Sequence, residues 1–154
     1  MAKANNFYLA NNALWFDDHS WNGFEWLDNT DKNNSVFLFQ RKGKTGSDKV
    51  IVALNMVPVP LQQYKIPVDE PGKYRISLNT DDMSFGGSGY PTGANEKGVF
   101  IAEEGQWKGR QFYISICLPP LSGMYIEKLS EPGTVTVIDT KMDTVTGKDL
   151  LKND

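Results

Sequence analysis

Two pairs of adjacent acidic residues, Asp81-Asp82 and Glu103-Glu104, are the first candidates for acid–base chemistry in this sequence. A glycosidase holds one carboxylic acid and one carboxylate on separate elements that flank the bond to be cleaved. We expect both pairs in loops, where neighbouring side chains point apart and are solvated. The pairs therefore give little support to a hydrolytic site made by this chain alone.

A metal site and a cysteine nucleophile are also weakly supported. His19 is the only histidine and follows Asp17 and Asp18, but a metal site needs three or four converging ligands. We therefore expect a surface histidine in a loop and no metal. Cys117 lies in an alternating stretch, on the side opposite to Phe112, with no histidine nearby in the sequence. It is predicted to be a packed strand residue rather than a nucleophile.

Two glycine-containing loops resemble anion-binding sequences. Residues 43–45 (GKT) end as a phosphate loop does, but Leu38 stands where a glycine is required, and a strand rather than a helix follows. Gly86–Gly89 offers backbone N–H groups that could cradle an anion, yet neither a basic residue nor a helix start accompanies it. We predict a hairpin tip at the first loop and a structural turn at the second.

Aromatic side chains are the remaining candidates, because their rings either stack on sugars or fill a core. The sequence has four tryptophans and six tyrosines. Trp15 and Trp21 fall outside the regular strands predicted below, so we interpret these two as interface residues. The other rings leave open a sugar-stacking platform or packing inside the fold.

The composition indicates one globular domain. The chain has 154 residues, 40% of them hydrophobic, and a net charge of −3 from scattered acids and bases. This pattern favours neither nucleic acid nor a membrane as partner. The N-terminus does not read as a signal peptide, and the single cysteine fits a reducing compartment, so we expect a cytoplasmic protein.

Short apolar stretches separated by turns must position these side chains. A single helix is predicted over residues 4–15, and it is short enough to need docking on another element. About eight strands with turns at intervals of about 8–12 residues predict an all-β fold, an antiparallel β-sandwich. The predicted strands are Phe24–Leu27, Val36–Gln40, Val50–Leu54, Gln62–Val68, Tyr74–Leu78, Val99–Ala102, Gln111–Leu118 and Gly123–Leu129.

Several short motifs in a fixed order suggest a family. They are LANNALW (9–15), GFEWL (23–27), NMVPVP (55–60), YKIP (64–67), LNTD (78–81), FGGSG (85–89) and LPPL (118–121). In this order, from about Phe7 to Leu129, the chain resembles the C-terminal all-β domain of 1,4-α-glucan (glycogen) branching enzymes of the α-amylase superfamily. Met56 replaces a usual aromatic residue, and a usual glycine is missing between Ile66 and Pro67.

The resemblance implies that the sequence is part of a longer enzyme. Residues 1–15 would be the remnant of a helix that precedes the domain, 16–129 the C-terminal β-sandwich domain, and 130–154 an extension with one possible extra strand at Thr134–Ile138. The family's catalytic acids lie in a (β/α)₈ barrel that this sequence does not contain. No catalytic, cofactor-binding or metal-binding residue is therefore carried over, and the parent enzyme would need no organic cofactor.

The resemblance further implies an accessory domain that packs on the catalytic barrel of the parent chain, which would transfer α-1,4-glucan chains to 6-hydroxyl groups. The residues expected to contact the barrel or a glucan are Trp15, Trp21, Asp81, Phe85 and Tyr90. An apolar patch that includes the two tryptophans would also favour self-association. A carbohydrate-binding module for α-glucan is the alternative, and a free-standing enzyme is a third and weaker hypothesis.

Overall fold

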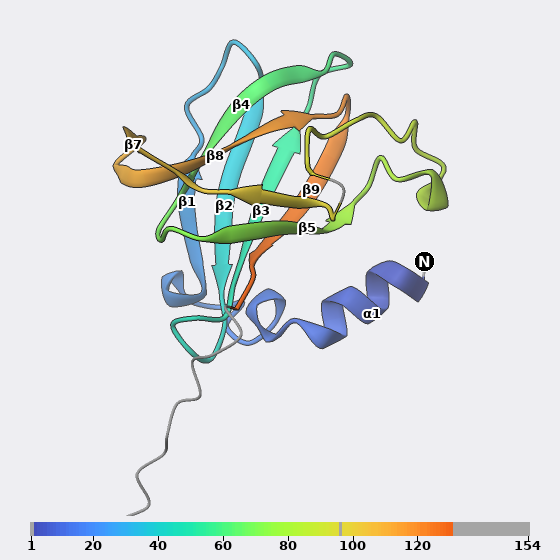
Figure 1. Cartoon of the computed structure of the whole chain (residues 1–154). Coiled ribbons are helices and arrows are strands. Elements are labelled where there is room, and N and C mark those ends of the chain that lie inside the picture. The colour runs from blue at the N-terminus through green and yellow to red at the C-terminus, as the bar shows by residue number, and fades with distance from the viewer. Residues whose placement is uncertain (1, 96, 131–154) are drawn as a thin grey trace, which may run out of the picture.

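Two antiparallel sheets form a β-sandwich in the computed structural model, which describes residues 2–95 and 97–130 (Figure 1). The six-stranded sheet has the order β1-β2-β3-β9-β5-β6, and the three-stranded sheet has the order β4-β8-β7. The larger sheet consists of β1 Phe24–Asp28, β2 Val36–Lys42, β3 Lys49–Asn55, β9 Ser122–Lys128, β5 Lys73–Asn79 and β6 Val99–Ile101. The smaller sheet consists of β4 Leu61–Val68, β8 Arg110–Leu118 and β7 Glu103–Trp107. The predicted all-β sandwich is confirmed.

The core lies between the two sheets and follows from the alternation of each strand. Its innermost side chains are Val36, Leu38, Ile66, Val68, Ile114, Ile116, Met124 and Ile126, each at most 1% exposed. Burying one such side chain contributes roughly 1.5–3 kcal/mol. These residues come from both sheets, so the core requires the sheets to stay face to face.

Asn55 joins the loops at one end of the sandwich. It is 1% exposed, and its amide donates to Val59 O at 2.9 Å and to Pro119 O at 2.8 Å, while its Oδ1 accepts from Val57 N at 3.1 Å. A buried amide of this kind must be hydrogen-bonded to be tolerated. The motifs NMVPVP and LPPL are thus neighbours in space because one side chain connects them.

The strand β7 was not predicted, and the expectation that Glu103 and Glu104 lie in a loop is wrong. Both glutamates begin β7, and Trp107 ends it. The strand forms the edge of the smaller sheet, and both of its faces are largely exposed. Its sequence therefore lacks the apolar alternation that reveals a half-buried strand, and charged residues are typical of protected edges.

The predicted N-terminal helix is shorter than expected. An α-helix, α1, spans Ala2–Ala10, and a 3₁₀ turn, η1, spans Asn12–Leu14. Asn11 adopts an extended conformation and donates from its side chain to Phe7 O at 2.9 Å. Asn12 instead bonds Asp48 at 3.1 Å. Asparagine side chains compete with helical hydrogen bonds in this way, so the pair ends the helix.

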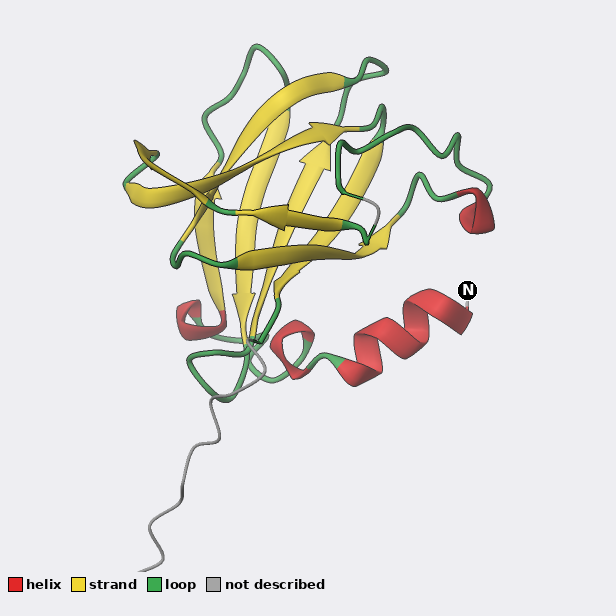
Figure 2. Cartoon of the chain, viewed as in Figure 1, coloured by secondary structure: helices red, strands yellow, loops and turns green. Residues whose placement is uncertain are grey.

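The helical turns lie outside the two layers of strands (Figure 2). Two further 3₁₀ turns are η2 at Trp21–Gly23 and η3 at Met83–Phe85. None of the helices in residues 2–95 and 97–130 is long and apolar enough to cross a membrane. The extra strand expected at Thr134–Ile138 falls outside the described residues, and the three-part division of the chain stays a prediction.

Candidate functional site

The larger sheet is apolar on its outer face as well as on its inner one. Val50 and Val52 of β3 point away from the inner core and are 1% and 2% exposed, because Ala13 of η1 packs on them. The Phe7 ring of α1 meets the Tyr125 ring of β9 edge to face, with 5.6 Å between the ring centroids. A sheet with two apolar faces needs a second covering layer. The N-terminal segment supplies only part of that layer.

The N-terminal segment itself exposes apolar side chains. The helix α1 has no buried residue, and Leu9 is 69% exposed and Tyr8 45% exposed. Just after η1, Trp15 is 43% and Phe16 is 50% exposed. We call these four residues the N-terminal apolar surface. A nine-residue helix is marginally stable alone, so such a surface is typical of a segment covered by a further partner.

Five aromatic rings form a second exposed group, which we call the aromatic cluster. Its members are Trp21, Phe24, Trp26, Phe37 and Phe39. Phe24 of β1 stacks on Phe39 of β2 with 5.2 Å between ring centroids, and Trp26 meets both rings edge to face at 5.0 and 5.8 Å. Trp21 is 80% exposed at the border of the cluster. The cluster combines fixed ring positions with exposed ring surface.

The segment before β1 holds Trp21 in place. Ser20 Oγ donates to Asp17 Oδ2 at 2.5 Å and accepts from Asn22 N at 3.1 Å, which caps η2. The hydrogen bond from the Ser20 side chain lowers the pKa of Asp17. Gly23 is required here because a Cβ atom would lie 2.1 Å from Asp17 O. The exposed indole therefore stands on a well-defined turn.

A shallow hollow runs along the aromatic cluster. It is lined by Trp21, Phe24 and Trp26 on one side and by polar residues from 17–20 and Arg41 on the other. Arg41 donates to the Asp18 carboxylate and to Asp17 O, the latter at 3.2 Å. Ring surface beside hydrogen-bonding groups is the combination that sugar-binding sites need.

The loop after β5 is a structural turn, as the sequence predicted. The Asp81 carboxylate accepts from Ser88 N at 2.8 Å, from Ser88 Oγ at 2.9 Å and from Tyr90 N at 2.8 Å. Partial desolvation raises the pKa of Asp81, but these hydrogen bonds outweigh it and lower the pKa. Gly89 N also donates to Asp81 O. The backbone N–H groups of residues 86–89 are thus already bonded within the loop, two of them to Asp81 and the others to Met83 O and Asp82 O.

The five predicted contact residues do not form one site. Asp81 serves the loop, and the Tyr90 hydroxyl accepts from Gln62 of β4 at 3.2 Å. Phe85 of η3 lies under Lys3 of α1, with the ammonium 5.4 Å from the ring centroid. Trp15 directly follows η1, and Trp21 begins η2. Whether any of the five contacts a barrel or a glucan stays a prediction.

Tyr8 and Leu9 of the N-terminal apolar surface were not among the predicted contact residues, and for Trp26 the sequence left open a sugar-stacking ring or packing inside the fold. The signal for Trp26 was available, because Phe24 and Trp26 share one parity of β1. That parity does not decide between the two, since a strand's alternation does not say which face is outside. The exposure of α1 depends on where the helix docks, which no local pattern specifies.

The other candidates for chemistry do not assemble into a site. In the described ranges, no three His, Cys, Asp or Glu side chains are placed to hold a metal ion. Asp82 caps η3 by accepting from Ser84 N at 2.8 Å, and Glu103 lies exposed on the edge strand β7. Cys117 is 5% exposed, and this burial raises the pKa of its thiol. The prediction of a packed cysteine is confirmed.

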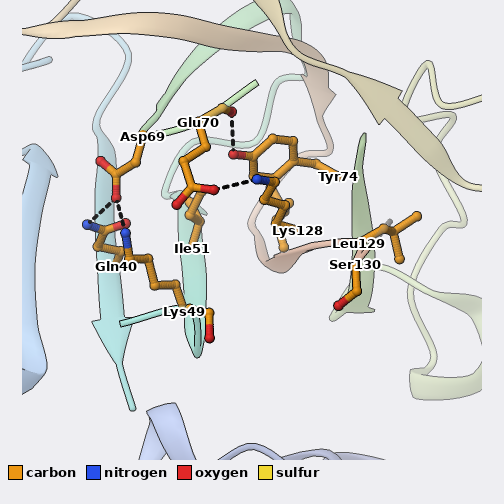
Figure 3. Close-up of a pocket in the computed structure, with 11 residues that line it drawn as sticks. Gln40, Lys49, Ile51, Asp69, Glu70, Tyr74, Lys128, Leu129 and Ser130 are labelled. Carbon is orange, nitrogen blue, oxygen red and sulfur yellow. Dashed lines mark hydrogen bonds and ion pairs between the residues drawn. The ribbon is translucent and has the colours of Figure 1, made fainter. Parts of the chain in front are cut away.

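A hollow of about 250 Å³ at one end of the sandwich is closed by ion pairs (Figure 3). Lys49 Nζ lies 2.7 Å from Asp69 Oδ2, Lys128 pairs with Glu70, and the Tyr74 hydroxyl donates to Glu70 O at 2.7 Å. Figure 3 shows these side chains directed at one another across the hollow. Because the charges are paired among themselves, we interpret this arrangement as a structural closure of the core.

The same network reaches both sheets through Glu25 and Arg110. Arg110 pairs with Glu25, and its Nε lies 2.6 Å from Asp69 Oδ1, close enough for an ion pair although not aligned as a hydrogen bond. Glu25 also accepts from Lys42 at 2.6 Å and from Gln40 at 2.8 Å. Partial burial raises the pKa of Glu25, but its hydrogen-bond donors prevail and lower the pKa to about 2.

Comparisons with known proteins agree with this fold. Residues 26–128 match the family described as "Alpha amylase, C-terminal all-beta domain". The chain is 37% identical over 123 residues to the 1,4-alpha-glucan branching enzyme GlgB of Desulfitobacterium hafniense (strain Y51), covering 80% of this chain and 19% of that enzyme. It is 38% identical to the GlgB of Aquifex aeolicus (strain VF5), again over 80% of this chain and 19% of the relative. The chain thus spans about a fifth of the length of these relatives.

Proposed function

We propose, from the premise that this chain belongs to the family of the alpha amylase C-terminal all-beta domain, that it is the accessory C-terminal domain of a 1,4-α-glucan branching enzyme. In this proposal the parent enzyme moves α-1,4-glucan chains to 6-hydroxyl groups with a catalytic barrel. The domain packs on that barrel and stabilises it. The observation that carries the proposal is the N-terminal apolar surface, which remains exposed after the sandwich has closed.

The position of α1 supports docking through this surface. Phe7 on α1 packs against the larger sheet, whereas Leu9 and Tyr8 on the same helix are exposed. A barrel placed over α1 would bury these side chains, and each large apolar side chain that becomes buried contributes roughly 1.5–3 kcal/mol. Two parts of one chain also avoid most of the entropic cost of association. The helix would then lie between two apolar partners.

Catalysis in this proposal belongs to the barrel of the parent enzyme, and the chain described here acts as a support. Several acids of the described residues have structural roles instead: Asp82 caps η3, Asp81 holds the loop after β5, and Asp69 pairs with Lys49. We also infer a cytoplasmic location, which agrees with a buried cysteine thiol that forms no disulfide.

A second function, contact with α-glucan, is favoured by the aromatic cluster. The hollow beside Trp21 and Trp26 joins exposed rings with the Asp18 and Arg41 side chains. Rings of this kind offer an apolar surface to the C–H face of a sugar, and the polar groups can bind its hydroxyls. The accessory role and this contact are compatible, because the cluster and the N-terminal apolar surface share no residue.

A chimera tests the accessory role. The matching C-terminal part of the Desulfitobacterium hafniense enzyme is replaced by this chain and compared with the same enzyme cut before that part. We expect the chimera to unfold at a higher temperature and to branch amylose faster than the truncated enzyme. If the grafted domain is folded, yet the chimera matches the truncated enzyme in both measurements, the proposed role is wrong.

A further inference from the structure

Three large apolar side chains are exposed at the end of the sandwich where Asn55 joins two loops. Met56 is 57%, Val59 is 52% and Leu121 is 67% exposed. Leu121 N donates to Val57 O at 3.0 Å, so the loop after β3 and the loop before β9 lie side by side. We call Met56, Val59 and Leu121 the loop-end surface. It shares no residue with the N-terminal apolar surface or with the aromatic cluster.

The backbone beneath the loop-end surface is held in place. Met56 N donates to Ser35 O at 3.2 Å, and the carbonyl groups of Val57 and Val59 each accept a hydrogen bond. Proline rings fix φ at four positions of the two loops, which are Pro58, Pro60, Pro119 and Pro120. A partner would therefore meet apolar side chains on a preformed support and would lose little entropy in ordering them.

Leu121 combines this exposure with a strained backbone. Its φ of +46° lies in the left-handed region, which glycine, asparagine and aspartate adopt more readily than leucine does. An exposed leucine also forgoes the stabilisation that burial of its side chain would give. Both features are unfavourable in the chain alone. Residues held in such a conformation are typical of contact sites that use their side chains.

The loop-end surface brings no charge of its own to a contact. The two stretches of chain that carry it, residues 50–64 and 111–126, contain no charged side chain. A partner recognised by its charge, such as a nucleic acid, would find no complementary group in these stretches. Exposed apolar side chains on an uncharged support fit an apolar patch of another protein surface.

One loop connects this end of the sandwich to the start of α1. Gly123 N donates to Thr80 Oγ1 at 2.8 Å, and Thr80 N donates to Gly123 O at 3.0 Å. Further along the same loop, Asp82 Oδ2 lies 3.7 Å from Lys3 Nζ of α1, and Figure 1 shows the turn η3 beside the N-terminal end of the helix. In the proposed parent enzyme the barrel precedes α1, so this side of the domain lies nearest to it.

We propose that the loop-end surface is a second contact with the catalytic barrel, in which Met56, Val59 and Leu121 pack on an apolar patch of the barrel. The inference rests on the proposed function and adds to it a contact apart from the N-terminal apolar surface. Two separate contacts would fix the orientation of the domain, which one short helix cannot do. The strain at Leu121 is retained, in this account, because its side chain is used in the contact.

Leu121→Asn tests the proposal, because asparagine tolerates the positive φ and removes the apolar side chain. In the isolated chain its thermal midpoint should equal or exceed that of the unmodified chain. In the chimera with the Desulfitobacterium hafniense enzyme, the same substitution should lower the midpoint by several degrees. Gln63→Asn is the matched control, since Gln63 is exposed and polar and has a φ of +49°. It should leave the midpoint of the chimera unchanged or raise it.

Oxidation of Met56 by peroxide tests the contact without a substitution. The exposed thioether should form a sulfoxide roughly five-fold more slowly in the chimera than in the isolated chain, whereas the fully buried Met124 should react slowly in both. Equal rates for Met56 in the two proteins would overturn the proposal, as would equal midpoints of the Leu121→Asn and Gln63→Asn chimeras. Either result would leave the accessory role intact, because that role is decided by comparing the chimera with the truncated enzyme.

Discussion

Glu25 gives the sharpest prediction about stability. It lies on β1 and accepts from Lys42 and Gln40 on β2 and from Arg110 on β8, so it connects the two sheets. Glu25→Gln keeps the size of the side chain and removes its charge. Arg110 retains its pairing with Asp69 in this variant. The substitution therefore removes the charge of one network member without opening a cavity.

The magnitude follows from the pKa of Glu25, which is lowered from 4.5 to about 2. At about 1.36 kcal/mol per unit of pKa difference, the ionised Glu25 contributes at most about 3.4 kcal/mol to the free energy of unfolding. The side chain is 31% exposed, so solvent screening reduces the expected loss to about 1–2 kcal/mol. Because the folded-state pKa is depressed, the stabilisation is present above pH 4.5 and is lost as the pH falls toward 2.

Urea unfolding of the wild-type chain and Glu25→Gln from pH 7 down to pH 2 measures this effect. We expect a gap of about 1–2 kcal/mol in the free energy of unfolding at pH 7, which narrows below pH 4.5. Glu104→Gln, at an exposed position on β7, is the control and should change the stability by less than about 0.5 kcal/mol. The reasoning is refuted if both variants behave alike at pH 7, or if the gap persists unchanged at pH 2.

Two further predictions concern the loop after β5 and the exposed rings. Gly87→Ala should destabilise the chain by about 2 kcal/mol or more, because a Cβ atom would lie 2.2 Å from the Asp81 backbone. Gly46→Ala, where a Cβ would meet no atom within 4 Å, should leave the stability unchanged. Equal thermal midpoints of Gly87→Ala and Gly46→Ala would contradict this account. We also expect the isolated chain to self-associate in sedimentation velocity, and Trp21→Ser to weaken that association several-fold. An unchanged association constant would show that the 80% exposed indole is not involved.

Much of the fold was predictable from the sequence because its strands alternate over one core. Leu38, Ile114 and Ile126 each belong to an alternating or continuous apolar stretch and each lies between the sheets. The strand β7 was not predictable in this way, since an exposed edge strand carries no apolar signal. The early end of α1 depends on Asn12 bonding Asp48, a contact between residues far apart in sequence.

The candidate sites were less predictable than the fold. Trp15 and Trp21 were singled out because they stand outside the strands, and both are exposed. For Trp26 the sequence left stacking on a sugar and packing inside the fold both open, because alternation cannot tell a face that is covered from a face that is exposed. Features of this kind arise from tertiary contacts.

The central claim, docking of the barrel through α1, is tested most directly by two matched substitutions in the chimera. Leu9→Glu and Ile101→Glu change exposed aliphatic residues, 69% and 66% exposed, on α1 and on β6. In the isolated chain both should leave the thermal midpoint nearly unchanged. In the chimera, Leu9→Glu should lower the midpoint of the whole enzyme by several degrees, because it would bury a charge at the contact, whereas Ile101→Glu should not. Equal midpoints of the two chimeric variants would contradict docking through α1.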